Sequence, residues 1–115
     1  MIRLKRAYEP ATASDGHRVL VERLWPRGVT KARLRLDAWA KDAAPSPALR
    51  RWFGHDPERW AEFRRRYIAE LRAHPTAWQP LLAAARRGMV TFIYAAHDVV
   101  HNGAVALKTF LDQRL

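Results

Sequence analysis

The chain has 115 residues, enough for one domain with a hydrophobic core but too few for two, so residues 1–115 are expected to form a single domain. Apolar residues make up 49% and charged residues 28%, which excludes a disordered chain, and the lack of cysteine excludes disulfides, thiolate nucleophiles and cysteine metal sites. Lysine and arginine number 21 against 11 aspartates and glutamates, and the net charge of +10 favours polyanions or phosphorylated ligands, unless it is only solvated helix surface.

Two short strands are predicted in the first quarter of the chain. Residues 2–5 and residues 18–24 alternate apolar and polar side chains, with β-branched residues in the second segment. The start lacks the apolar segment of a secretory signal, so nothing directs export and we expect a cytoplasmic protein. Residues 14–16 supply turn chemistry, and residues 25–28 should end the second strand because Pro26 cannot donate to a strand ladder.

The middle of the chain predicts helices. The pattern over residues 30–39 is too brief to distinguish a helical turn at residues 30–35 from an edge strand at residues 34–39. Ser46 followed by proline predicts the start of a helix that Gly54 ends. Asp56 followed by proline begins a longer amphipathic helix with a basic outer side, whose apolar face carries Trp60, Phe63, Tyr67 and Leu71.

A further helix is expected around residues 78–85, where Pro80 is tolerable only inside the first turn. Residues 89–96 are apolar on both faces, which is typical of a central strand covered on both sides, and are far too few for the roughly 20 residues of a membrane helix. Asn102 is expected to cap the last helix. Strands separated by helices predict an α/β fold: a small three-layer domain with a mostly parallel sheet of three to four strands flanked by helices.

Two segments are expected at the carboxyl ends of the strands, where open parallel sheets bind ligands. In the first, Arg23 and Arg27 flank Trp25 and offer two guanidiniums and an indole to a phosphate or carboxylate. The second runs from Tyr94 to Asn102 and ends at a helix N-terminus suited to anions. The alternatives are that Trp25 is a core aromatic, that the arginines pair with carboxylates, and that Asn102 only caps its helix.

Catalysis in such a pocket would need a general acid or base, and the candidates are His55, Tyr94 and Asp98. No nucleophile elbow or glycine-rich phosphate loop is present, so whether the protein is an enzyme stays open. His97 and His101 have a spacing that binds metal from a helix, but they span an expected turn with no third ligand nearby. We therefore expect no metal site, and nothing indicates a cofactor.

Several strings of the sequence occur together in one family: Lys5-Arg6 with Tyr8, the run from Asp15 to Gly28 containing Arg-Leu-Trp-Pro-Arg-Gly, Ala44-Pro45-Ser46, and Tyr94-Ala95-Ala96 with Asn102. They resemble the bacterial YeaO-like proteins, domain of unknown function 488, over essentially the whole chain. The resemblance implies no established activity. It implies a compact α/β domain and a polar cluster at the matching positions Lys5, Arg6, Tyr8, Arg18, Arg23, Arg27 and Asn102.

The chain departs from that family at three positions. The family more usually has Asp at Glu22, Tyr at His17 and His at Gly103. These differences put in doubt any role that needs a carboxylate at one exact reach, or a histidine beside Asn102.

Two functions from different classes follow. In the first, a small phosphorylated or nucleotide-like anion is held by Lys5, Arg6, Arg23 and Arg27, with Trp25 or Tyr8 stacking on it, with or without a reaction. In the second, a non-catalytic nucleic-acid-binding module uses the basic helix face, including residues 64–66, and its binding weakens steeply with salt. The localised strand-end arginines favour the first. The sequence does not predict the oligomeric state.

Overall fold

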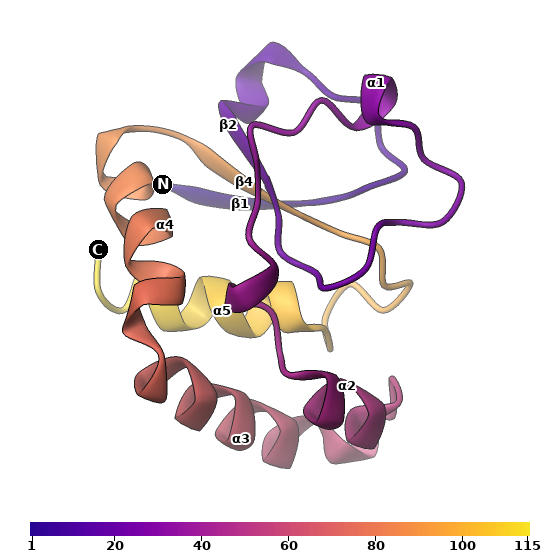
Figure 1. Ribbon diagram of the computed structural model, residues 1–115, viewed down its shortest axis with the longest axis vertical. Coiled ribbons are helices and arrows are strands. Elements are labelled where there is room, and N and C mark those ends of the chain that lie inside the picture. The colour runs from indigo at the N-terminus through magenta and orange to yellow at the C-terminus, as the bar shows by residue number, and fades with distance from the viewer.

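The computed structural model describes residues 1–115 and contains a four-stranded parallel sheet (Figure 1). The strands are β1 (Ile2–Arg6), β2 (His17–Leu20), β3 (Ala38–Trp39) and β4 (Val90–Tyr94), in the spatial order β1-β4-β2-β3. Leu4 and Val19 both pair with Phe92, and Val19 also pairs with Ala38. The predicted α/β fold is confirmed, and the sheet is parallel throughout.

Strand β4 lies between β1 and β2, as its apolar sequence predicts. All five of its residues are buried. Val90, Phe92 and Tyr94 join the larger hydrophobic cluster of the protein, whereas Ile93 joins a smaller one on the opposite face. Side chains of a strand alternate between its two faces, so a strand covered on both sides must be apolar at every position that lacks a polar partner.

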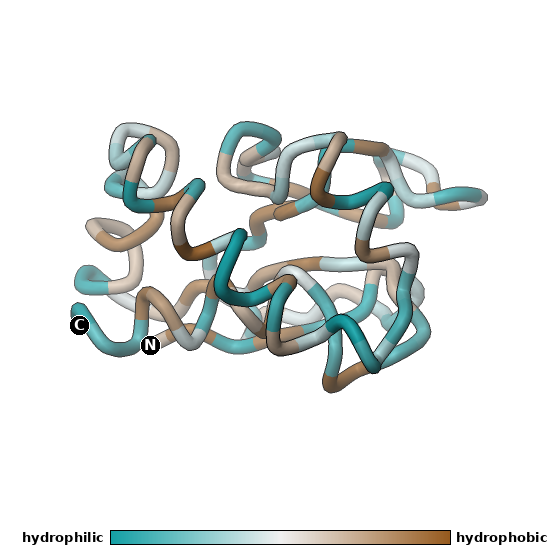
Figure 2. The backbone as a smooth tube through the Cα atoms, turned by 90° about the horizontal axis from the view of Figure 1, so that it is seen from below, coloured by the Kyte–Doolittle hydropathy of each residue, from teal (hydrophilic) through white to brown (hydrophobic).

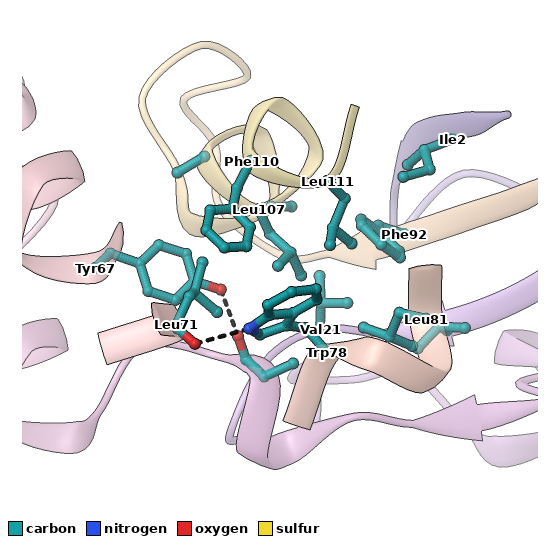
Figure 3. Packing of buried hydrophobic residues seen from close by; sticks show 14 of the residues in the cluster. Ile2, Val21, Tyr67, Leu71, Trp78, Leu81, Phe92, Leu107, Phe110 and Leu111 are labelled. Atoms are coloured by element: carbon teal, nitrogen blue, oxygen red, sulfur yellow. Dashed lines mark hydrogen bonds between the residues drawn. The ribbon is translucent and has the colours of Figure 1, made fainter. Parts of the chain in front are cut away.

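Four helices lie on one side of the sheet: α2 (Pro47–Phe53), α3 (Trp60–Ala73), α4 (Pro75–Arg87) and α5 (Gly103–Asp112) (Figure 1). Of these, α5 packs on β1 and β4, and α3 packs on α5. Their tubes alternate between hydrophilic and hydrophobic stretches, as amphipathic helices do (Figure 2). Their apolar side chains join those of the sheet in a cluster of 21 buried residues, in which Trp78 and Phe110 meet edge to face (Figure 3). No helix combines the length and the apolar character needed to cross a membrane.

The opposite face of the sheet is covered by the connection between β2 and β3, which contains the one-turn helix α1 (Lys31–Leu34). Val29 and Leu34 from this connection pack with Leu20 and Ile93. Residues 30–39, for which the sequence allowed either a helical turn or an edge strand, thus form both: the helical turn α1 is followed by the edge strand β3. The second covering layer is mostly irregular chain rather than long helix.

The predicted helix starts at Ser46 and Asn102 are confirmed, whereas Asp56 caps a short 3-10 helix (Pro57–Arg59) that leads into α3 at Trp60. Ser46 Oγ accepts from the Leu49 amide at 3.1 Å, Asp56 Oδ1 from the Glu58 amide at 3.0 Å, and Asn102 Oδ1 from the Val105 amide at 3.0 Å. Gly54 ends α2 with φ 55°, in the left-handed region that glycine adopts without steric cost.

Two boundaries predicted from the sequence are wrong. Strand β2 ends at Leu20 rather than at residue 24, because only the Val21 amide still bonds to β4, at 3.2 Å from Ile93 O, and Leu24 is exposed. Helix α4 begins at Pro75, which places Pro80 in its interior instead of its first turn. The Trp78 indole anchors the helix upstream of Pro80 by donating to Leu71 O at 2.7 Å, and Pro80 itself is exposed, where water can replace the missing backbone bond.

Candidate functional site

A cleft of about 520 Å³ opens at the carboxyl ends of β2 and β4. Residues 21–24, which follow β2, form one part of its lining, and residues 95–98, which follow β4, form another. The start of α5 at residues 102–104 completes this edge. The two strands are parallel neighbours, so their carboxyl ends meet at the same edge of the sheet, where ligands of open α/β sheets bind.

The cleft combines an apolar floor with a few polar groups. Phe53 and Phe63 stack at 4.2 Å between ring centroids and share the apolar lining with Val21 and Ala104. The polar side chains of the lining belong to Glu22, Arg23, Arg50, His55, His97, Asp98 and Asn102. Such a mixture, mostly apolar with few polar groups that fix orientation, is usual in small-molecule sites.

Glu22 is the half-buried carboxylate of this cleft. Its Oε1 accepts a hydrogen bond from the Ala95 amide at 3.0 Å, which ties the chain after β2 to the chain after β4. Burial raises the pKa of Glu22, and the Ala95 hydrogen bond together with the nearby charges of His55 and Arg50 offsets this only in part. No ion pair neutralises this carboxylate.

Arg23 lines the cleft and bonds to the backbone of Pro45, another lining residue. Its Nε donates to Pro45 O at 3.0 Å and one Nη donates to Ala44 O at 3.5 Å, while the other Nη lies 3.9 Å from a carboxylate oxygen of Asp42. The guanidinium is therefore largely engaged by the protein itself. By contrast, the exposed side chain of Arg50 makes no hydrogen bond or ion pair within the protein, and it is the free cation of the lining.

The loop between β4 and α5 is held by its own side chains. Asp98 accepts from the amides of Val100 and His101 and from His101 Nδ1, each at 2.9 Å, and these bonds lower its pKa to about 2. Asn102 Nδ2 donates to Asp98 O at 2.9 Å. The loop thus fixes the first turn of α5, where the amides of residues 103 and 104 have no acceptor in the protein.

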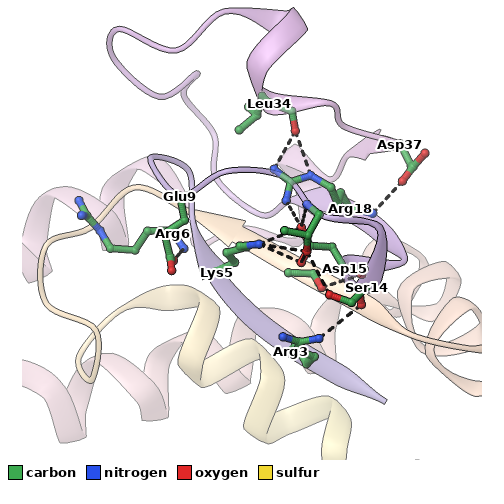
Figure 4. A network of polar contacts seen from close by, with 11 residues as sticks. Arg3, Lys5, Arg6, Glu9, Ser14, Asp15, Arg18, Leu34 and Asp37 are labelled. Carbon is green, nitrogen blue, oxygen red and sulfur yellow. Dashed lines mark hydrogen bonds and ion pairs between the residues drawn. The ribbon is translucent and has the colours of Figure 1, made fainter.

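The structure places Lys5 and Arg18 away from the cleft, on the face of the sheet that α1 covers (Figure 4). Lys5 Nζ lies 3.0 Å from Asp15 Oδ1. Arg18 donates to Asp15 Oδ2 at 2.6 Å and to Leu34 O at 3.0 and 2.8 Å. Both cations bind the buried carboxylate of Asp15, and Arg18 also binds the buried carbonyl of Leu34. They cannot reach a ligand in the cleft.

Arg6 and Tyr8 lie beside the chain that leaves β4, but neither lines the cleft. Arg6 donates to Ala96 O at 2.9 Å and to Ala95 O at 3.1 Å, and its guanidinium lies 5.0 Å from the centre of the Tyr8 ring. The Tyr8 hydroxyl donates to Arg27 O at 3.2 Å. Arg6 thus holds Ala95 and Ala96, which line the cleft, without lining the cleft itself.

Trp25, Arg27 and Tyr94 also lie outside the lining. The Trp25 indole donates to Val29 O at 2.6 Å and meets the Trp39 ring edge to face, so it is partly buried against the smaller hydrophobic cluster, near the packing role that the sequence allowed as an alternative. Arg27 is exposed, and Tyr94 is buried in the large cluster, where burial raises its pKa. Of the predicted ligand-binding residues, the structure brings Arg23 and Asn102 together.

The remaining catalytic candidates, His55 and Asp98, both line the cleft. His55 is exposed and adopts φ 57°, a conformation uncommon for residues other than glycine. His101 is paired with Asp98, and His97 is exposed. No three histidine, aspartate or glutamate side chains gather in a way that could hold a metal ion.

The family model described as the inactive DUF488-N3 subclade matches residues 1–115, the whole chain. The chain belongs to the DUF488 family. The uncharacterized protein YeaO of Escherichia coli (strain K12) is 42% identical to it over 110 residues, which cover 96% of each chain. The uncharacterized protein Rv3073c of Mycobacterium tuberculosis (strain ATCC 25618 / H37Rv) is 41% identical over 113 residues, covering 98% of this chain and 95% of the relative. No solved structure matches.

The resemblance to YeaO-like proteins is thus confirmed. Several residues that line the cleft of this chain were nevertheless not predicted from the sequence. Glu22, Arg50 and the pair of phenylalanines at its floor were not predicted as site residues. Glu22 directly precedes Arg23 at the strand end, so its position could have signalled a role. Arg50 could not be distinguished from its neighbour Arg51 without the fold, because only Arg50 turns toward the cleft.

Proposed function

We propose that this DUF488 protein binds a small phosphorylated or nucleotide-like anion in the cleft, and that it acts by binding rather than by conversion. One observation carries the proposal: Arg50, whose guanidinium has no partner in the protein, lines the same cleft as residues 103 and 104 of α5, whose amides have no acceptor in the protein. A guanidinium and a helix N-terminus are the groups that proteins use to hold phosphate and carboxylate oxygens. The volume of about 520 Å³ suits a small organic molecule.

Three features support binding without turnover. The matching family model is itself described as inactive. Asp98 accepts three hydrogen bonds from its own loop, and a pKa of about 2 makes it a poor proton acceptor at neutral pH. Tyr94 lies in the core rather than in the cleft, so His55 is the one catalytic candidate of the lining that these features do not remove.

The alternative, a nucleic-acid surface on α3, has weaker support. Arg65 and Arg66 pair with Glu62 at 2.6 and 2.8 Å, and the Arg66 guanidinium also lies 4.2 Å from the centre of the Trp52 ring. Arg64 lies over Trp60 at 5.6 Å. Because these guanidiniums already have partners within the protein, the free cation in the cleft favours a small anion.

A thermal-shift screen tests the proposal. Nucleotides, sugar phosphates, inorganic phosphate and short oligonucleotides are compared at low and high salt, with Arg50→Ala and the matched variant Arg51→Ala. We expect a small phosphorylated ligand to raise Tm at both salt concentrations, through Arg50 and not Arg51. Stabilisation by oligonucleotides alone, lost at high salt, would contradict the proposal and favour the basic surface.

A further inference from the structure

We infer that Glu22 accepts a hydrogen bond from a hydroxyl group of the ligand, and hence that the ligand is a phosphorylated sugar or nucleoside carrying free hydroxyls. The inference rests on the proposed function, since it concerns the same cleft. It assigns to Glu22 a role in specificity, and it narrows the class of anion from any phosphate to one that also carries hydroxyl donors.

The hydrogen bonds of Glu22 leave one of its oxygens available. Oε1 accepts from the Ala95 amide, and no other protein donor or cation contacts the carboxylate. No fully buried side-chain nitrogen or oxygen in the protein lacks a hydrogen-bond partner. The second oxygen of Glu22 has no protein partner and is therefore not fully buried, and Glu22 belongs to the lining of the cleft.

The charge of Glu22 limits what can lie against it. A phosphate in direct contact with this carboxylate would be repelled, so the phosphate is expected to bind the Arg50 guanidinium and the first turn of α5 instead. The part of the ligand beside Glu22 must instead donate a hydrogen bond. Hydroxyl groups form short, strong hydrogen bonds with carboxylates, and burial in an apolar cleft strengthens them further.

The rest of the lining fits the carbon skeleton that joins these two ends. The stacked pair Phe53 and Phe63 adds aromatic surface to the same lining as the polar groups, and the cleft has room for more than a phosphate ion. A ligand with a phosphate at one end, an apolar ring face and hydroxyls at the other end matches all three features. Sugars and nucleosides bearing a phosphate have this arrangement.

The test compares ligands that differ only in their hydroxyls. Isothermal titration calorimetry measures Kd for adenosine monophosphate and its dideoxy analogue, and for ribose phosphate and tetrahydrofurfuryl phosphate, which lacks the ring hydroxyls. We expect the wild-type protein to bind the hydroxylated member of a pair roughly tenfold or more tightly, because the other member leaves a carboxylate oxygen unpaired.

The variant Glu22→Gln should reduce this discrimination to roughly twofold or less, since it keeps an acceptor for the Ala95 amide but replaces the free carboxylate oxygen by an amide donor. The matched control is Glu58→Gln, which changes an exposed carboxylate outside the cleft. It should leave the Kd values of both members of each ligand pair unchanged. Equal Kd values within the pairs for the wild-type protein would overturn the inference while leaving anion binding intact. If no member of either pair binds, the proposed function fails along with it.

Discussion

Arg18 Nη1 lies 2.6 Å from Asp15 Oδ2, and both side chains are almost fully buried, with exposed fractions of 4% and 1%. Lys5 approaches the other carboxylate oxygen from β1, and Arg18 bonds to the last carbonyl of α1 (Figure 4). This network joins two strands to the segment that covers them. Two members of the polar cluster implied by the family resemblance therefore stabilise the fold and are not available to a ligand.

Removing the charge of Asp15 should be costly. Asp15→Asn leaves Arg18 buried without a counterion, and breaking a buried ion pair in this way costs about 3–5 kcal/mol. Urea unfolding followed by circular dichroism measures the difference. The exposed pair of Lys108 and Asp112 is the control, because Asp112→Asn should cost less than about 1 kcal/mol. Similar losses in the two variants would show that the buried network contributes little.

The same network predicts how stability depends on pH. Burial by itself would raise the pKa of Asp15, but hydrogen bonds from Thr12, Lys5 and Arg18 outweigh it and hold the pKa well below the usual range. The folded protein thus releases this proton more readily than the unfolded chain, whose aspartates titrate near pH 4. The stabilisation is complete above about pH 4 and is lost as the pH falls toward the lowered pKa.

Urea midpoints measured between neutral pH and about pH 2 check this dependence. The wild-type midpoint should fall steeply below about pH 4, and the Asp15→Asn midpoint should fall less. Parallel curves for the two proteins would exclude Asp15 as the source of the acid sensitivity.

The contribution of Glu22 to stability should depend on pH in the opposite direction to that of Asp15. Burial raises its pKa, so the folded protein retains this proton to higher pH than the unfolded chain does, and stability falls as the pH rises from the unfolded value through the folded value. Glu22→Gln removes this effect. We expect Tm of the variant to exceed that of the wild type at neutral pH, with a smaller difference near pH 4. A variant less stable than the wild type at neutral pH would indicate a structural role for the carboxylate.

Gly16 is the glycine whose substitution should disturb the sheet. It has φ 63°, and a Cβ atom there would lie 2.4 Å from Met89 O, the acceptor of the His17 amide at the start of β2. Gly16→Ala should therefore cost about 2–4 kcal/mol in unfolding free energy. Gly88→Ala is the control, because nothing lies within 4 Å of its added Cβ and its φ of 173° is ordinary extended backbone; it should change stability by less than about 0.5 kcal/mol.

The fold followed from local patterns where those patterns were strong. The apolar run at β4, the caps Ser46, Asp56 and Asn102, and the terminating Gly54 each carry their cause within a few residues, and each was predicted correctly. The end of β2 was not predicted correctly, because Val21 and Leu24 are as apolar as strand residues although β2 ends at Leu20. Residues 21–24 line the cleft instead of continuing the strand.

The site was harder to predict because its members are contributed by separate segments. The sequence predicted that the segments following β2 and β4 form the site, but it could not show that Trp25 packs against the smaller hydrophobic cluster or that Arg18 is held by Asp15. Arg50 comes from a helix that reaches the cleft only through the packing of α2 against α3. Such long-range placement leaves no periodic signal in the sequence.

The measurement that tests the central claim most directly is a backbone amide NMR titration of the full chain with ribose phosphate and, separately, with a short single-stranded oligonucleotide. If the cleft binds a phosphorylated ligand, the sugar phosphate shifts the amides of residues 21–24 and 95–104 in a saturable way, and Arg50→Ala abolishes the shifts. If only the oligonucleotide produces shifts, and these fall on residues 59–66 at the start of α3, the assignment of the cleft as the binding site is contradicted.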